Sequence, residues 1–168
     1  MALRPVVLLF LGAVLALTAA RADAVAAETT GLPLPRFVSL RADEVNLRTG
    51  PGVQHPIDWV YRRRHLPVEI IAEYNTWRKI RDWQGTEGWV HQSMLSNKRT
   101  VVVTGKLRTL RHKSDTTGRP VAQAEAGVIA RLLECPDAST WCRVEVDGFE
   151  GWFRRVEFWG AYGDEVVR

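Results

Sequence analysis

The pentapeptide 85-GTEGW-89 returns as 148-GFEGW-152, 63 positions further along the 168-residue chain. When the two copies are superimposed, Trp77 aligns with Trp141, so the similarity extends upstream of the motif. Self-similarity at one fixed period is typical of a chain built from a repeated structural unit. Because the unit is about 63 residues long, we expect two small domains in tandem.

Strand patterns dominate both copies, and no window after residue 30 keeps a helical period for three turns. Runs such as 68-VEII-71 and 143-RVEV-146 are rich in β-branched residues and are separated by Gly, Pro and Asp. The Ala- and Leu-rich segment 121–133 contains Gly127, and its counterpart in the first copy contains Pro67. We therefore interpret that segment as two strands about a turn, and predict an all-β chain with two small barrels.

The motif in the second copy is predicted to close a two-residue hairpin. An Asp147-Gly148 turn favours the left-handed backbone that such hairpins need. This register places Val144 opposite Gly151, and Gly151 then lets a neighbouring strand or side chain approach closely.

The first copy has one extra residue at the same turn, which we expect Gly85 to absorb in the left-handed conformation. Ile80 is then opposite Gly88, and Lys79 is opposite Trp89. Both hairpins thus pair an aliphatic residue with Gly on one face and a cation with Trp on the other.

Alternation along these strands separates a core face from an outer face. The core face is predicted to contain Ile80, Val90, Val144, Val146 and Phe153. The outer face is predicted to contain Trp77, Lys79, Arg81, Glu87 and Trp89. Two tryptophans above a basic stem suit stacking on sugar rings or peptide groups, although loops of the same repeat are an alternative cover for these rings.

The N-terminal residues have the three regions of a secretory signal peptide, which we assign to residues 1–24. Arg4 precedes an apolar run over residues 5–17, and small residues follow it. An uncleaved membrane anchor is the alternative, but this run is shorter than the roughly 20 residues that cross a bilayer. We expect an exported protein, periplasmic or secreted, that is not inserted in the membrane after cleavage, with a linker at residues 25–35.

Cys135 and Cys142 are the two cysteines of the chain. In an exported protein two cysteines usually pair, so we expect a disulfide. The alternative, a nucleophilic thiol, is disfavoured because Cys142 lies inside a predicted hairpin and not at a helix N-terminus.

Upstream of the first hairpin, 45-VNLRTGPG-52 is followed by a W-x-K-I strand at 77–80 and the sequence GTEGWV at 85–90. This combination resembles the bacterial SH3 domain, a small five-stranded barrel of exported cell-envelope proteins. The resemblance implies two tandem SH3-like barrels and a short tail, at residues 36–97, 98–163 and 164–168.

The second copy departs from the family pattern. Where the first copy has Gly50-Pro51-Gly52, the second has Lys113-Ser114-Asp115, so we assign function to the first copy. The segment 158-FWGAYGDE-165 is similar to the end of a tandem subfamily found in exported proteobacterial proteins. The predicted turn and core positions are Gly50, Pro51, Gly52, Gly85, Gly88, Gly148 and Gly151.

The resemblance implies a binding or targeting module without catalytic activity, often for peptidoglycan or its stem peptides. A barrel of this size has no room for a deep pocket, so we expect an open groove lined by aromatic side chains. Because Trp59 and Tyr61 flank Val60, at least one of these three is expected in the core. The predicted ligand-binding residues are Trp59, Tyr61, Tyr74, Trp77 and Trp89, with Lys79 and Arg81 available to a stem-peptide carboxylate.

An exported scaffold that binds a protein partner is the alternative function. A wall hydrolase is disfavoured because no metal-ligand spacing relates the four histidines, His55, His65, His91 and His112. The net charge of +4 is small, and 62-RRRH-65 is the one concentrated basic patch, so we expect no nucleic-acid partner. No cofactor and no metal are expected.

Overall fold

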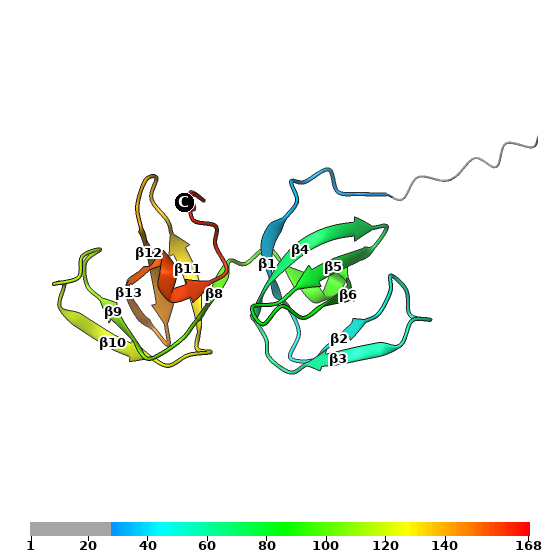
Figure 1. Cartoon of the computed structure of the whole chain (residues 1–168), viewed down its shortest axis with the longest axis horizontal. Helices are drawn as coiled ribbons and strands as arrows, with labels where there is room; N and C mark the ends of the chain where they lie inside the picture. Colours follow the sequence, from blue (N-terminus) through cyan, green and yellow to red (C-terminus); the bar gives the residue numbers. More distant parts are fainter. Residues whose placement is uncertain (1–27) are drawn as a thin grey trace, which may run out of the picture.

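The computed structural model describes residues 28–168, which form two β-barrels joined by a short connection (Figure 1). Within these residues, helix is limited to two 3-10 turns of three residues each. The prediction of an all-β chain with two tandem barrels is confirmed. The predicted signal peptide, at residues 1–24, lies outside the described residues.

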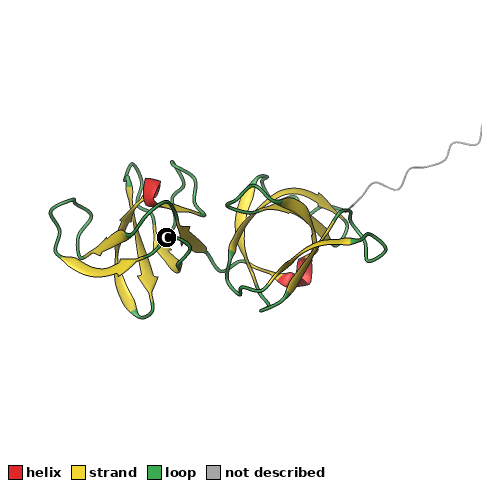
Figure 2. Cartoon of the chain, turned by 60° about the horizontal axis from the view of Figure 1, so that its bottom comes forward, coloured by secondary structure: helices red, strands yellow, loops and turns green. Residues whose placement is uncertain are grey.

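Barrel one is a single antiparallel sheet with the strand order β3-β2-β6-β5-β4-β1-β7. Figure 2 shows its strands curving around a common core. Its elements are β1 (Arg36–Leu40), β2 (Val45–Arg48), β3 (Ile57–Tyr61), β4 (Pro67–Tyr74), β5 (Trp77–Arg81), β6 (Glu87–His91), the 3-10 turn η1 (Gln92–Met94) and β7 (Leu95–Ser96).

Barrel two repeats this arrangement element by element, in the order β10-β9-β13-β12-β11-β8-β14. Each sheet has seven strands, not the five expected; the last of them, β7 or β14, has two residues and pairs with the first strand of its barrel. The elements of barrel two are β8 (Thr100–Val103), β9 (Arg108–Arg111), β10 (Pro120–Ala124), β11 (Ile129–Glu134), β12 (Trp141–Val146), β13 (Phe149–Arg154), the 3-10 turn η2 (Arg155–Glu157) and β14 (Phe158–Trp159).

The β5–β6 hairpin has the predicted register, with Ile80 opposite Gly88 and Lys79 opposite Trp89. Gly85 has a φ of 89°, the left-handed conformation expected for the extra residue of this turn.

The β12–β13 hairpin also has the predicted register, with Val144 opposite Gly151. Its turn residues Asp147 and Gly148 have φ angles of 49° and 84°, as a two-residue hairpin with right-handed strand twist requires. The segment 121–133 forms parts of β10 and β11, so its interpretation as two strands is confirmed.

The paired glycines allow a second strand to pack directly on the hairpin. A Cβ atom on Gly88 would lie 2.6 Å from Cγ of Leu47, and one on Gly151 would lie 2.6 Å from Cγ of Leu110. Both leucines are fully buried. The core prediction is confirmed for all five of its members, Ile80, Val90, Val144, Val146 and Phe153.

The two barrels differ at one buried cross-strand position. In barrel two the predicted disulfide is present, linking Cys135 to Cys142 of β12. Because Trp77 and Trp141 are equivalent, the next residue in barrel one, Arg78, corresponds to Cys142. Arg78 forms an ion pair of 3.2 Å with Glu73 across the hairpin, so charge replaces the covalent link there.

The barrels touch each other through aromatic side chains. The ring of Phe37 in β1 packs on Trp159, at 4.8 Å between centroids, and on Tyr162, at 4.7 Å. The Tyr162 hydroxyl donates a hydrogen bond of 2.7 Å to a carboxylate oxygen of Glu69 in β4. Packing and a polar contact therefore join the end of the second repeat to the first barrel.

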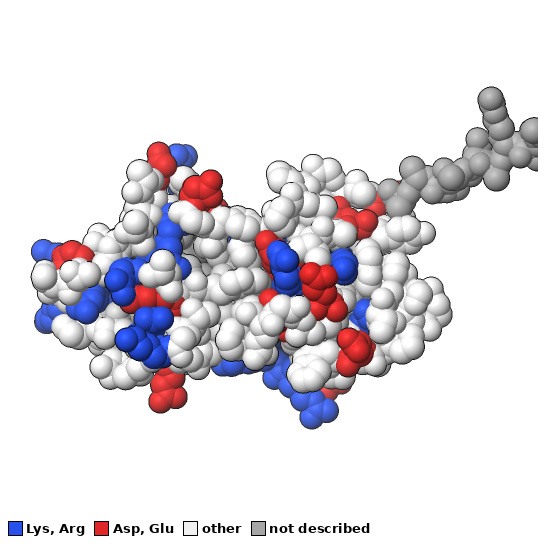
Figure 3. Space-filling view, in the orientation of Figure 1, with Lys and Arg blue, Asp and Glu red and all other residues white. Residues whose placement is uncertain are grey.

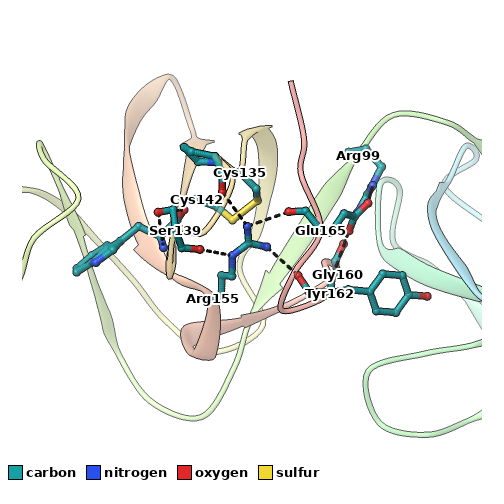
Figure 4. Close-up of a disulfide and its surroundings, with 10 residues drawn as sticks. Arg99, Cys135, Ser139, Cys142, Arg155, Gly160, Tyr162 and Glu165 are labelled. Atoms are coloured by element: carbon teal, nitrogen blue, oxygen red, sulfur yellow. Dashed lines mark hydrogen bonds and ion pairs between the residues drawn. A yellow bond between two sulfur atoms is a disulfide. The ribbon is translucent and has the colours of Figure 1, made fainter.

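Residues 160–168 run across one end of barrel two (Figure 4). Val167 and Cys135 exchange two backbone hydrogen bonds, of 2.9 and 3.0 Å. The Arg155 guanidinium donates to the Glu165 carbonyl at 2.8 Å. These contacts make the expected tail, 164–168, part of the barrel.

Candidate functional site

The outward-facing side chains of β5 and β6 form a row on the surface of barrel one. Between them in the sequence, Arg78 and Ile80 are buried, so alternation directs their neighbours outward. The cross-strand pairs of this row are Trp77–His91, Lys79–Trp89 and Arg81–Glu87. These are the residues predicted for the outer face, with His91 in addition.

A groove of about 260 Å³ lies at the Trp77 end of this row, against β2 and η1. Trp77, Val53 and Met94 contribute apolar surface, whereas the other side chains offer hydrogen-bonding groups and charges of both signs. We call this the Trp77 groove; it is lined by Glu44, Asn46, Arg48, Val53, Trp77, His91, Ser93 and Met94.

Trp77 and His91 are held in a defined arrangement in the groove. Their rings meet edge to face, with centroids 5.5 Å apart. Nδ1 of His91 accepts a hydrogen bond of 3.3 Å from the backbone N–H of Ser93 and lies 2.8 Å from the Ser93 hydroxyl. With Nδ1 accepting from Ser93, Nε2 is the ring nitrogen left to donate to a ligand.

The loop at residues 49–56 forms the rim of the groove beside Val53. Arg48 holds this loop by donating to the backbone carbonyls of Val53, at 3.1 Å, and His55, at 2.7 Å. The loop packs closely on itself, since a Cβ atom on Gly50 would lie 2.6 Å from the His55 ring. The Gly-Pro-Gly turn thus positions the rim and does not itself contact the groove.

Tyr61 does not belong to the ligand-binding surface, contrary to the prediction. It is 5% exposed, and its hydroxyl donates a hydrogen bond of 2.9 Å to Asp82. Burial and the adjacent Asp82 carboxylate raise the pKa of Tyr61. The expectation that one of Trp59, Val60 and Tyr61 is a core residue is confirmed, and that residue is Tyr61.

The remaining predicted aromatic residues are spread over the surface. Trp59 and Tyr74 are 55% and 46% exposed, yet neither lines the Trp77 groove. Trp89 is half-buried and also lies outside it. Of the predicted aromatic set, the groove therefore contains Trp77 alone.

Lys79 and Arg81 are occupied by ion pairs within the barrel. Nζ of Lys79 lies 2.7 Å from Glu87, and Arg81 donates hydrogen bonds of 3.0 and 2.7 Å to Glu69. The hydrogen bond from Lys79 is the main cause that lowers the pKa of Glu87. Basic and acidic groups are interspersed on the face shown in Figure 3. The structure therefore does not leave these two cations free for a stem-peptide carboxylate.

Barrel two does not reproduce the chemistry of the groove. The counterpart of His91 is Arg154, whose guanidinium donates to Glu157 at 3.0 Å. The counterpart of Ser93 is Val156, which is exposed. Trp141 is retained opposite Arg154, so it offers a matched comparison with Trp77.

Several groove residues were not predicted from the sequence, among them Arg48, His91 and Met94. Arg48 stands inside the motif 45-VNLRTGPG-52, and His91 directly follows GTEGWV. Proximity to the family motifs was the available signal. Met94 carries no comparable signal, because the 3-10 turn that presents it has no sequence pattern of its own.

Within residues 28–168, no group of three or more His, Cys, Asp or Glu side chains is placed to hold a metal ion. None of the helical turns in that part of the chain has the length and apolar character to cross a membrane. Both cysteines are disulfide-bonded, so neither thiol is free.

Comparison with known proteins identifies the family. Among solved structures, the chain is similar to NlpC1 from Trichomonas vaginalis, with 12% identity, a TM-score of 0.35, and coverage of 79% of this chain and 48% of that chain. It is also similar to NlpC2 from Trichomonas vaginalis, with 10% identity, a TM-score of 0.35, and coverage of 76% and 48%. The chain spans about half the length of these structures. None of the curated proteins matches it. The model of the bacterial SH3 domain matches residues 41–97 and 105–160, and the chain therefore belongs to the bacterial SH3 domain family.

Proposed function

We propose that this protein is a non-catalytic, exported binding module that recognises cell-wall peptidoglycan through its stem peptides in the Trp77 groove. The family supports a binding role. The observation that carries the proposal is an open groove in which an indole, a thioether, a histidine donor and charges of both signs converge.

The chemistry of the groove suits a short peptide with amide and charged groups. The edge-to-face contact with His91 fixes the indole of Trp77, which offers a flat surface for peptide groups or sugar rings. Nε2 of His91 is available to donate to a carbonyl. Glu44 has a long ion pair of 3.7 Å with Arg62, and its carboxylate remains 62% exposed and can attract an amine. A groove about 260 Å³ in volume accommodates a few residues and not a folded domain.

The test is co-sedimentation of the chain from Val25 onward with purified peptidoglycan sacculi at several salt concentrations. Trp77→Ala is expected to weaken binding about tenfold or more, because it removes the aromatic anchor of the groove. Trp141→Ala is the matched control, since it deletes the equivalent indole in barrel two. It is expected to bind as the unaltered chain does.

Two outcomes contradict the proposal. If both tryptophan variants pellet like the unaltered chain, the ligand does not use the groove. If the unaltered chain stays in solution at low salt, wall binding is wrong, and an exported protein partner becomes the function to test. Circular dichroism of each variant shows whether a loss reflects unfolding.

A further inference from the structure

One end of barrel two is covered by an extended segment of the same chain. Its own residues 160–168 lie across that end (Figure 4). The Glu165 carboxylate binds the Arg99 guanidinium, with one contact of 2.9 Å, and Val167 pairs with the backbone of Cys135. Val167 also packs against the core. An extended segment with an acidic residue and an apolar one therefore closes the barrel.

Barrel one has a cavity of about 270 Å³ at the corresponding end. Strand pairing makes Arg36 the counterpart of Arg99, and the order of elements makes Gln92 the counterpart of Arg155. Both line the cavity. Its apolar floor and its basic rim are formed by Val38, Ile70, Leu95, Arg36, Arg41 and Arg78.

The charges around this barrel-one cavity are not balanced. Glu73 lies 2.6 Å from Arg36 and 3.2 Å from Arg78, so one carboxylate serves two guanidinium groups. Arg41 is exposed and forms no ion pair with any residue of 28–168. Nη1 of Arg36 is buried and has no hydrogen-bond partner among the same residues. A further carboxylate at the exposed Arg41 would balance this excess of positive charge.

The chain segment beside the cavity does not supply that carboxylate. Thr30 lines the cavity, but its N–H and hydroxyl donate to Glu73, at 2.7 and 2.8 Å. Thr30 thus consumes acceptors of Glu73 and adds no negative charge. In barrel two, by contrast, the acid that meets the equivalent arginine comes from the segment lying across the end.

We propose that the barrel-one cavity binds an extended acidic segment of an exported protein partner, in the way that barrel two binds residues 160–168. The partner's carboxylate would contact Arg41, and an apolar side chain would rest on Val38 and Leu95. This site is separate from the Trp77 groove, with which it shares no lining residue.

The experiment uses the chain from Val25 onward and a fluorescent peptide with the sequence of residues 160–168, read by anisotropy. A second peptide carries Glu165→Gln and is expected to bind about tenfold more weakly, because the ionic hydrogen bonds are lost. In the protein, Arg41→Ala and Asn97→Glu change two exposed residues that line the cavity, and circular dichroism checks that each variant is folded. Each is expected to weaken binding of the first peptide several-fold.

Arg64→Ala is the matched control, since Arg64 is an exposed arginine outside the cavity. Equal binding of the two peptides, or equal losses for Arg41→Ala and Arg64→Ala, would overturn the proposal, as would no binding of the first peptide. Loss of binding in Trp77→Ala would place the peptide in the groove and also overturn it. If the peptide instead displaced residues 160–168 from barrel two, its binding would not change in Arg41→Ala, and that result would contradict the proposal.

Discussion

At the scale of single residues, the β5–β6 and β12–β13 hairpins each depend on a glycine, because a side chain at that position would clash with the neighbouring strand. Gly88 and Gly151 stand opposite aliphatic residues, and each lies under a buried leucine of the neighbouring strand. The backbone carbonyl oxygen of Arg48 would lie 2.9 Å from a Cβ on Gly88. Since a carbonyl in a strand cannot move aside easily, glycine is required here for space.

Gly88→Ala is expected to lower the free energy of unfolding by about 2 kcal/mol, because the added methyl group overpacks the contact with Leu47. Chemical denaturation measures the change. Gly163→Ala is the control, since a Cβ atom at Gly163 would meet nothing within 4 Å. Equal stability of the two variants would show that the close approach is not needed.

Tyr61→Phe tests the buried hydroxyl that was expected to face a ligand. Its loss leaves Asp82 without one hydrogen bond, so we expect a decrease in stability of about 1–2 kcal/mol. Peptidoglycan binding is expected to be unchanged, because Tyr61 does not line the groove. A stable variant that no longer binds sacculi would restore Tyr61 to the ligand-binding surface.

At the scale of elements, the two strands of the β4–β5 hairpin and those of the β11–β12 hairpin are linked by different interactions. The Glu73–Arg78 pair and the Cys135–Cys142 disulfide occupy equivalent positions near the ends of these hairpins. Burial acts to raise the pKa of Glu73, but hydrogen bonds from Thr30 and Arg36 and the charge of Arg78 outweigh it and lower the pKa to about 2.

Barrel one is therefore expected to lose stability in acid. The pKa of Glu73 falls from 4.5 to about 2 on folding, so its contribution is complete above pH 4.5 and is lost as the pH falls from 4.5 to about 2. We expect a loss of about 2 kcal/mol over this range, measured by denaturation at each pH. Glu73→Gln is expected to be less stable at pH 7 and to flatten this pH dependence; an unchanged slope would contradict the role of Glu73.

Barrel two is expected to respond to reductant instead. Replacing both cysteines, Cys135→Ala with Cys142→Ala, is expected to reduce stability by about 2–3 kcal/mol, since a short covalent loop no longer restricts the unfolded chain. Denaturation with and without reductant measures this, and the double variant is expected to be insensitive to reductant. A reductant effect on the double variant would show that the loss has another origin.

Much of these elements could be predicted from sequence because the information is local. Turn chemistry at Asp147-Gly148 and the Gly at 88 and 151 determined the hairpin registers. The binding surface was harder to predict from sequence. Lys79 and Arg81 form ion pairs with Glu87 and Glu69, and these pairs exist only once the folded sheet brings the strands together. The burial of Tyr61 likewise depends on Asp82, which is 21 positions away.

At the scale of the whole molecule, the barrels are coupled by Phe37, Tyr162 and Glu69. The Phe37 ring contacts two aromatic rings of the second repeat. Burial and the hydrogen bond to Glu69 raise the pKa of Tyr162, so its hydroxyl remains a donor at neutral pH. Because the barrels are in contact, the Trp77 groove and the barrel-one cavity belong to a unit of two barrels.

Phe37→Ala is expected to uncouple the barrels by removing about 3 kcal/mol of packing. The radius of gyration in small-angle scattering is expected to increase, while the far-ultraviolet circular dichroism of the strands stays the same. Phe149→Ala, at an exposed phenylalanine of the β12–β13 hairpin, is the control and is expected to have no effect. An unchanged radius in Phe37→Ala would show that other contacts hold the barrels together.

Residues 160–168 have a consequence for the order in which the molecule folds. Barrel one has all of its strands once Ser96 has been synthesised, whereas barrel two needs Val167 on Cys135 to close its end. A chain synthesised from its N-terminus can therefore complete barrel one first. Barrel two and its junction with barrel one can be completed only later, because Tyr162 contacts Phe37 and Val167 pairs with Cys135. We therefore expect residues 160–168 to be the last part of the molecule to fold into place.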